Sequence, residues 1–107
     1  MDKIPFEPQG WQVAMQFEDW QVAYLGYNER FASLTGFERH MLTDEVFVLL
    51  RGEAVLYVEQ DVIPMEQGVV YNVKKAEWHH IVVSPDACVL VVENRNTSLE
   101  NTERRPV

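Results

Sequence analysis

Two short polar segments, each followed by an apolar run, hold the residues of this 107-residue chain that could do chemistry. The first places Glu38, His40 and Glu45 within eight residues, and the second is Glu77-Trp78-His79-His80. Residues two apart on a strand share a face, so Glu38 and His40 can point the same way. If His79 arrives from a distant strand, Glu38, His40, Glu45 and His79 can converge as nitrogen and oxygen donors inside one barrel.

These donor types suit a divalent metal ion. Two imidazoles with one carboxylate form a set that fits non-haem Fe(II), and Mn, Ni, Co and Zn also accept such donors. A second carboxylate, from Glu38, would make the site neutral around a divalent ion. Alternatively, Glu38 is a solvated charge that pairs with Arg39 or Arg51. The sequence favours the ligand role and the ion-pair role about equally. His80 has the opposite strand parity from His79, so we expect it to face outward and not to bind the metal.

Short apolar runs bounded by turn residues must position these side chains. Trp11 to Tyr27 reads as two strands around a turn at Glu18-Asp19, and the segment 28–34 fits either a single helical turn or a strand. Pro64 cannot donate a ladder hydrogen bond, which places its short strand at a sheet edge. The expected strands beyond these are Val46–Leu50, Ala54–Val58, Val62–Met65, Val69–Val73, Trp78–Val83 and Ala87–Glu93.

The pattern predicts one all-β domain of eight or nine short strands, a sandwich or barrel, over residues 1–107. Residues 1–10 contain Pro5, Pro8 and Gly10 and are expected to form an extended arm. The polar tail, residues 95–107, follows the last apolar run, and we expect it to be frayed.

The spacing of the two polar segments resembles the two motifs of the cupins, the small RmlC-like double-stranded β-helix or jelly-roll family. The first motif, G-x5-H-x-H-x(3,4)-E-x6-G, is matched in spacing by Glu38-x-His40-x4-Glu45-x6-Gly52, with Glu38 in place of the first His. The second, G-x5-P-x-G-x2-H-x3-N, keeps its spacing and retains Gly68 and His79. It has Lys74, Ala76 and Val83 where the family has Pro, Gly and Asn.

The resemblance implies a jelly-roll barrel in which His40, Glu45 and His79 occupy three metal-ligand positions and Glu38 the fourth. Cupins include dioxygenases, isomerases, epimerases, decarboxylases, storage proteins and sugar-binding sensors, so the fold does not select a reaction. Three hypotheses stay open: a metal site that acts on or binds a small molecule, a metal-free binding module for a sugar or carboxylate, and polar residues that serve structure only. Tyr57, Tyr71 and Trp78 are candidates for a ligand pocket, although aromatic residues on strands are more often core or dimer contacts.

The amino-acid composition limits the classes of partner that the protein could bind. The formal net charge is −8, which argues against a nucleic-acid partner and gives no support for an anionic membrane surface. No apolar run approaches the ~20 residues of a membrane span, and the N-terminus does not resemble a signal peptide, so we expect a cytoplasmic protein. Cys88 is the only cysteine and reads as a small buried residue. The runs Val46–Leu50 and Val89–Val92 are apolar on both parities, which predicts a homodimer that packs outer sheet faces together.

Overall fold

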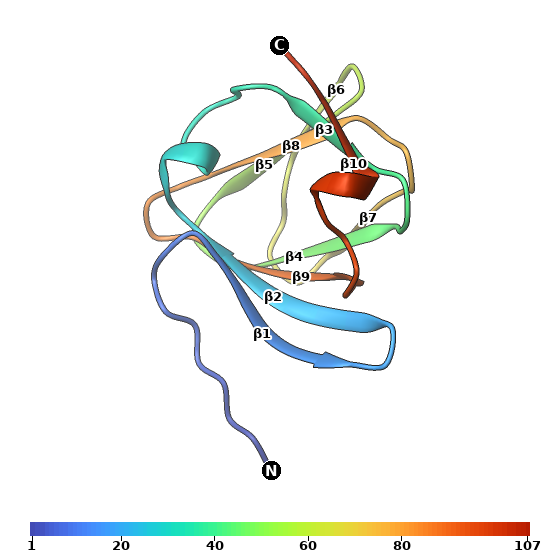
Figure 1. Ribbon diagram of the computed structural model, residues 1–107. Coiled ribbons are helices and arrows are strands. Elements are labelled where there is room, and N and C mark those ends of the chain that lie inside the picture. The colour runs from blue at the N-terminus through green and yellow to red at the C-terminus, as the bar shows by residue number, and fades with distance from the viewer.

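The computed structural model describes residues 1–107 and consists of two five-stranded antiparallel sheets that face each other (Figure 1). The first sheet has the order β1-β2-β9-β4-β7, and the second has the order β10-β3-β8-β5-β6. Two single 3-10 turns, η1 and η2, complete the chain, and no helix is long and apolar enough to cross a membrane. The first sheet contains β1 (Trp11–Phe17), β2 (Trp20–Gly26), β9 (Cys88–Asn94), β4 (Glu45–Arg51) and β7 (Val70–Val73). The second contains β10 (Thr102–Arg105), β3 (Phe37–His40), β8 (His79–Val83), β5 (Ala54–Val58) and β6 (Asp61–Pro64); the turns are η1 (Glu29–Phe31) and η2 (Leu99–Asn101).

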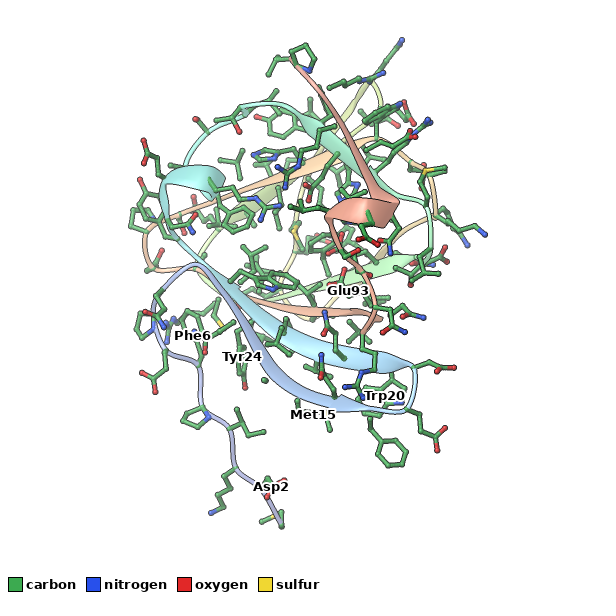
Figure 2. All side chains as sticks on the ribbon, in the orientation of Figure 1. Asp2, Phe6, Met15, Trp20, Tyr24 and Glu93 are labelled. Atoms are coloured by element: carbon green, nitrogen blue, oxygen red, sulfur yellow. The ribbon has the colours of Figure 1, made fainter.

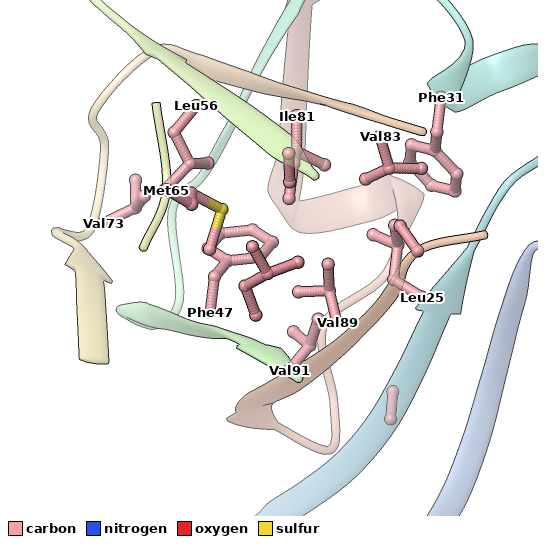
Figure 3. Close-up of a cluster of buried hydrophobic side chains, with 14 residues drawn as sticks. Leu25, Phe31, Phe47, Leu56, Met65, Val73, Ile81, Val83, Val89 and Val91 are labelled. Atoms are coloured by element: carbon pink, nitrogen blue, oxygen red, sulfur yellow. The ribbon is translucent and has the colours of Figure 1, made fainter. Parts of the chain in front are cut away.

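The core lies between the two sheets and follows from strict alternation along their central strands. Phe47 and Leu49 of β4 point inward with Val89 and Val91 of β9, and Leu56 of β5 meets them from the opposite sheet (Figure 3). Glu45 has the same parity as Phe47 and Leu49 and is buried with them. The apolar alternation of β4 therefore carries the Glu45 carboxylate into the barrel.

Gly52 ends β4 in a backbone conformation that explains the motif glycine. Its φ is +78°, and a Cβ at this position would lie 2.7 Å from Ala87 Cα. A side chain would therefore meet the backbone of the turn before β9 as well as the strain of the left-handed region. This sharp turn carries the chain from β4 in the first sheet to β5 in the second sheet.

The expected strands are present, with ends that differ by a residue or two, and Pro64 lies on β6 at a sheet edge as predicted. Of the two structures expected for the segment 28–34, a helical turn or a strand, the turn is present. It is η1, and the Asn28 side chain caps it. The N-terminal arm projects from the barrel, and its Phe6 packs on Tyr24 of β2 with ring centroids 5.6 Å apart (Figures 1 and 2).

The expectation of a frayed tail is wrong. Residues 102–105 form β10, which pairs along its whole length with β3 and covers one edge of the second sheet. The η2 turn before it is closed by a reciprocal pair of hydrogen bonds between Ser98 and Asn101. The tail reads as polar because β10 is an edge strand whose residues are mostly exposed, so it lacks the apolar alternation of a buried strand.

Candidate metal centre and cavity

Three strands bring the central donors together at one end of the barrel. His40 ends β3, Glu45 begins β4 and His79 begins β8. The Glu45 Oε1 atom lies 3.0 Å from Nε2 of His40 and 3.0 Å from Nε2 of His79. All three side chains are buried. The structure thus assembles two imidazole nitrogens and a carboxylate oxygen from residues up to 39 positions apart in the sequence.

The other nitrogen of each ring is engaged by a second residue. His79 Nδ1 lies 3.1 Å from the Glu77 carbonyl oxygen, which can only accept, so this nitrogen carries the proton. His40 Nδ1 lies 2.9 Å from the Thr102 hydroxyl of β10. Such outer partners fix ring orientation and leave Nε2 to face a metal, as is usual for histidine ligands.

Charge in this cluster is tightly coupled. Burial alone would raise the pKa of Glu45, but its hydrogen bond to His79 and the adjacent charges of His79 and His40 outweigh burial and lower that pKa to about 2. Burial alone would lower the pKa of both histidines, but the Glu45 carboxylate reverses the effect and raises both. In the absence of a metal, the ionised Glu45 carboxylate stabilises the protonated, positively charged forms of His40 and His79.

Glu38, the fourth predicted ligand, lies in the same region but has other partners. It is directly opposite His79 in the β3–β8 register, and its Oε1 is 3.8 Å from His40 Nε2. Both carboxylate oxygens accept from Arg30 Nη2 at 3.0 Å, and Arg104 Nε lies 3.5 Å from Oε2. The ion pair that the sequence suggested as an alternative role for Glu38 is thus present. Its partners are Arg30 and Arg104 instead of Arg39 or Arg51.

The structure corrects the expectation that His80 faces outward into solvent. His80 is on the opposite face of β8 from His79, as its parity requires, but the segment after η1 covers it and leaves it 8% exposed. Its Nε2 donates to the Ser33 carbonyl oxygen at 2.9 Å. Burial is the main reason that the pKa of His80 is lowered.

The three aromatic candidates for the pocket lie outside the cavity. Tyr57 is on the face of β5 opposite the inward-pointing Leu56. The Tyr71 hydroxyl accepts from the Glu66 backbone N–H at 2.9 Å while its ring packs on the core. Trp78 stacks against Arg39, whose guanidinium carbon is 4.5 Å from the ring centroid. Their roles are packing and surface stacking, the alternative that aromatic residues on strands more often adopt.

Glu93 is a site residue that the motifs did not indicate. It is the second-to-last residue of β9, has the parity of Val89 and Val91, and is 6% exposed. Gln21 of β2 pairs with it in register and donates from Nε2 to its Oε2 at 2.9 Å. Parity was the available signal, because a residue two positions beyond a buried valine on the same strand points into the same interior. Burial and the nearby charge of Glu45 raise the pKa of Glu93 to about 7.

A cavity of about 230 Å³ opens onto these groups. Glu38, His40, Glu45, His79 and Glu93 form its polar wall. The lining also includes residues of η2 and of the tail that was expected to be frayed. The remaining lining residues are Trp11, Leu25, Arg30, Phe31, Phe47, His80, Ile81, Thr97, Ser98, Leu99, Thr102 and Arg104. The volume is below the range of about 300–1,000 Å³ that is usual for small-molecule pockets.

The donor set fits a divalent ion on two grounds that are internal to the molecule. Imidazole nitrogens and carboxylate oxygens are ligands of Mn, Fe, Co, Ni and Zn. In addition, His40 Nε2 is buried and makes no hydrogen bond, because its 3.0 Å contact with Glu45 lacks hydrogen-bond geometry. A buried ring nitrogen without a hydrogen-bond partner is unfavourable, and in the neutral imidazole its lone pair could bind a metal ion. His40, Glu45 and His79 could therefore hold the ion, with Glu38 and Glu93 within reach.

Comparison with known proteins places the fold. No protein-family model matches the chain, and no curated protein matches it. Among solved structures, a cupin-2 domain-containing protein from Shewanella frigidimarina is 20% identical with a TM-score of 0.69, and the match covers 84% of each chain. Pac13 from Streptomyces, described as a unique nucleoside dehydratase, is 11% identical with a TM-score of 0.71 over 99% of this chain and 92% of that one. KdgF from Halomonas sp. is 14% identical with a TM-score of 0.66, over 78% and 77% of the two chains.

These likenesses extend over most of the chain, including both motif segments. Identities of this size carry the architecture and not the chemistry. Together with the two facing sheets and the convergence of both motifs at one cavity, they establish that this chain has the cupin fold.

Proposed function

We propose that this cupin-fold protein holds a divalent metal ion (Fe, Mn, Ni, Co or Zn) at His40, Glu45 and His79 and binds or transforms a small molecule in the adjoining cavity. The observation that carries the proposal is the approach of both Nε2 atoms to one carboxylate oxygen, at 3.0 Å each, beside a cavity that a small ligand can enter. Structures of variants of the neighbour Pac13 contain uridine, which supports a small-molecule occupant for a barrel of this size.

The protein's own groups would divide the work in the following way. A bound divalent ion would supply Lewis acidity or a site of oxygen activation. The carbonyl of Glu77 and the hydroxyl of Thr102 orient the two imidazoles, and the apolar side chains of Phe31 and Leu25 exclude water from part of the cavity. The charges of Arg30 and Arg104 at the cavity wall would attract an anionic group on the ligand.

Metal analysis of the protein purified without added metal tests this proposal. We expect close to one divalent ion per chain, and an increase in unfolding temperature when Mn, Fe, Co, Ni or Zn is added back to chelator-treated protein. Absence of bound metal together with no thermal response to any of the five ions would contradict the metal function.

The alternative is a metal-free, non-catalytic binding module for a sugar or carboxylate. One observation favours it: Arg30 and Arg104 already engage Glu38 at the cavity wall, and these guanidinium groups are equally suited to the carboxylate of a ligand. This alternative predicts that a ligand raises the unfolding temperature of metal-free protein without turnover. A ligand effect that required metal would argue against it.

We also propose that the protein assembles as a homodimer through the outer face of its first sheet. Val22, Val46 and Val92 lie in register across β2, β9 and β4 on that face, as do Tyr24, Val48 and Leu90. The same face continues to Val70, which is 64% exposed. Rows of partly exposed apolar side chains are typical of protein contacts. Light scattering at micromolar concentration should give the mass of two chains, and a monomer would contradict the assembly.

A further inference from the structure

Two buried side-chain atoms in this molecule have no hydrogen-bond partner, and they lie in the same place. They are Nε2 of His40 and Oε1 of Glu93. Both residues are more than nine-tenths buried, so water compensates neither atom freely. A buried ring nitrogen and a buried carboxylate oxygen that lack hydrogen-bond partners are each unfavourable. Their occurrence together indicates a shared, missing partner.

The missing partner has the character of a cation. Ligating atoms of His40, Glu45 and Glu93 all lie within 4.8 Å of one another. Two carboxylates this close repel when both are ionised. A positive ion between them would remove the repulsion and satisfy both orphaned atoms at once.

Glu93 is oriented by a chain of side-chain hydrogen bonds that reaches the surface. Arg95 Nη2 donates to Gln16 Oε1 at 2.9 Å, Gln16 Nε2 donates to Gln21 Oε1 at 2.8 Å, and Gln21 Nε2 donates to Glu93 Oε2 at 2.9 Å. Each amide oxygen accepts from the preceding donor, which orients the amide so that its NH2 group faces the next acceptor. The relay binds one carboxylate oxygen and leaves Oε1 free at the cavity wall, where Glu93 is labelled in Figure 2. Such outer support is characteristic of metal-binding carboxylates.

Glu38 presents the opposite case. Its two oxygens are already bound to Arg30 and approached by Arg104. To bind a metal, Glu38 would have to give up a bidentate ion pair, whereas Glu93 would gain a partner that it lacks.

We propose that Glu93 is a ligand of the divalent metal ion, completing a set of two imidazoles and two carboxylates with His40, Glu45 and His79, while Glu38 stays on its arginines. This inference rests on the proposed metal function. The two carboxylates neutralise a divalent ion, and the mixture of nitrogen and oxygen donors suits Mn, Fe, Co or Zn.

The test compares two isosteric changes, Glu93→Gln and Glu38→Gln, with the unaltered protein. Chelator-treated protein is titrated with Mn²⁺ by calorimetry and with Co²⁺ by visible absorption, which reports the ligand set directly. We expect Glu93→Gln to weaken Mn²⁺ binding at least about tenfold and to change the Co²⁺ spectrum. We expect Glu38→Gln to change Mn²⁺ affinity less than about threefold and to leave the spectrum as it was, since direct ligation is what moves both readouts.

Stability of the metal-free protein separates a ligand from a structural residue. Because Glu93→Gln removes the repulsion with Glu45, the metal-free variant should unfold at a higher temperature than the unaltered protein at pH 8. It should nevertheless gain less from added Mn²⁺. A variant that binds Mn²⁺ and Co²⁺ as the unaltered protein does would overturn the assignment of Glu93 and leave the metal function standing. Failure of the unaltered protein to bind either ion would overturn both.

Discussion

Glu38 and Glu93 are the same residue type, they line one cavity from different sheets, and their surroundings differ in every respect that matters to ligation. Glu38 is on β3 at the rim, where arginines from η1 and β10 neutralise it. Glu93 is on β9 in the interior, with a neutral amide on one oxygen and nothing on the other. The motif position belongs to Glu38, but the unsatisfied carboxylate belongs to Glu93. The difference shows that an ion pair can occupy a motif position while the carboxylate that lacks a partner lies on a strand of the other sheet.

The largest effect should come from removing a histidine ligand, because the metal site would contain both histidines whether Glu38 or Glu93 is the second carboxylate. His79→Ala, and separately His40→Ala, should lower metal affinity by more than about 100-fold, because each removes an imidazole donor from the set. The far-ultraviolet circular dichroism should stay that of a β-protein, since the core around Phe47 and Leu56 is untouched.

His80→Ala is the matched control for both histidine changes. His80 is buried on the other face of β8 and donates to Ser33, so its loss should lower stability and leave metal affinity unchanged. Metal affinity that fell equally in all three variants would indicate a general loss of structure.

A smaller effect should come from the β10 side of the cavity. Thr102→Val keeps the shape of the side chain but removes the hydroxyl beside His40 Nδ1. We expect about tenfold weaker metal binding, because the outer partner of a histidine ligand orients it. Thr97→Val is a suitable comparison, since the Thr97 hydroxyl also borders the cavity but donates to the Asn94 carbonyl. Equal losses in both variants would contradict a specific role for Thr102.

The charge coupling predicts how the metal-free protein responds to pH. His40, His79 and Glu93 all have raised pKa values in the folded state, so the folded protein binds more protons than the unfolded chain does over the interval above their ordinary values. Their contribution to stability is therefore complete at lower pH and is lost as pH rises through the raised values. The lowered pKa of His80 makes stability rise with pH, but this is one group, whereas three groups have the opposite effect.

We accordingly expect the unfolding temperature of metal-free protein to fall as pH rises from about 5.5 to about 8, the range spanned by these groups. Glu45, with a pKa of about 2, loses its contribution only as pH drops below its ordinary value of 4.5. The increment that saturating Mn²⁺ adds should grow over the same interval, because ligands must be deprotonated to bind. Calorimetric scans at several pH values measure both trends, and a metal-free unfolding temperature that rose with pH would refute the coupling.

The smallest effect concerns the backbone beneath the site. Ala76 has a φ of +70°, at the position where the second cupin motif has glycine, and its N–H donates to the His40 carbonyl at 2.9 Å. Ala76→Gly should stabilise the fold by about 1 kcal/mol, because an L-residue in the left-handed region is strained. Ala32→Gly, at an ordinary φ of −79°, should instead destabilise it slightly. Chemical denaturation distinguishes the two, and metal affinity should not change in either.

The sequence by itself determined most strands of the two sheets, because alternation is a property of short stretches of chain. The spacing of the two cupin-like motifs predicted that His40, Glu45 and His79 would meet, although these residues come from three strands. Only the tertiary structure decided which partners the two carboxylates have and whether the tail is ordered. The partners of Glu38 come from η1 and β10, Glu93 becomes a site residue only where β9 lies between β2 and β4, and β10 is ordered only by pairing with β3. Each depends on contacts between segments far apart in sequence, which no local pattern records.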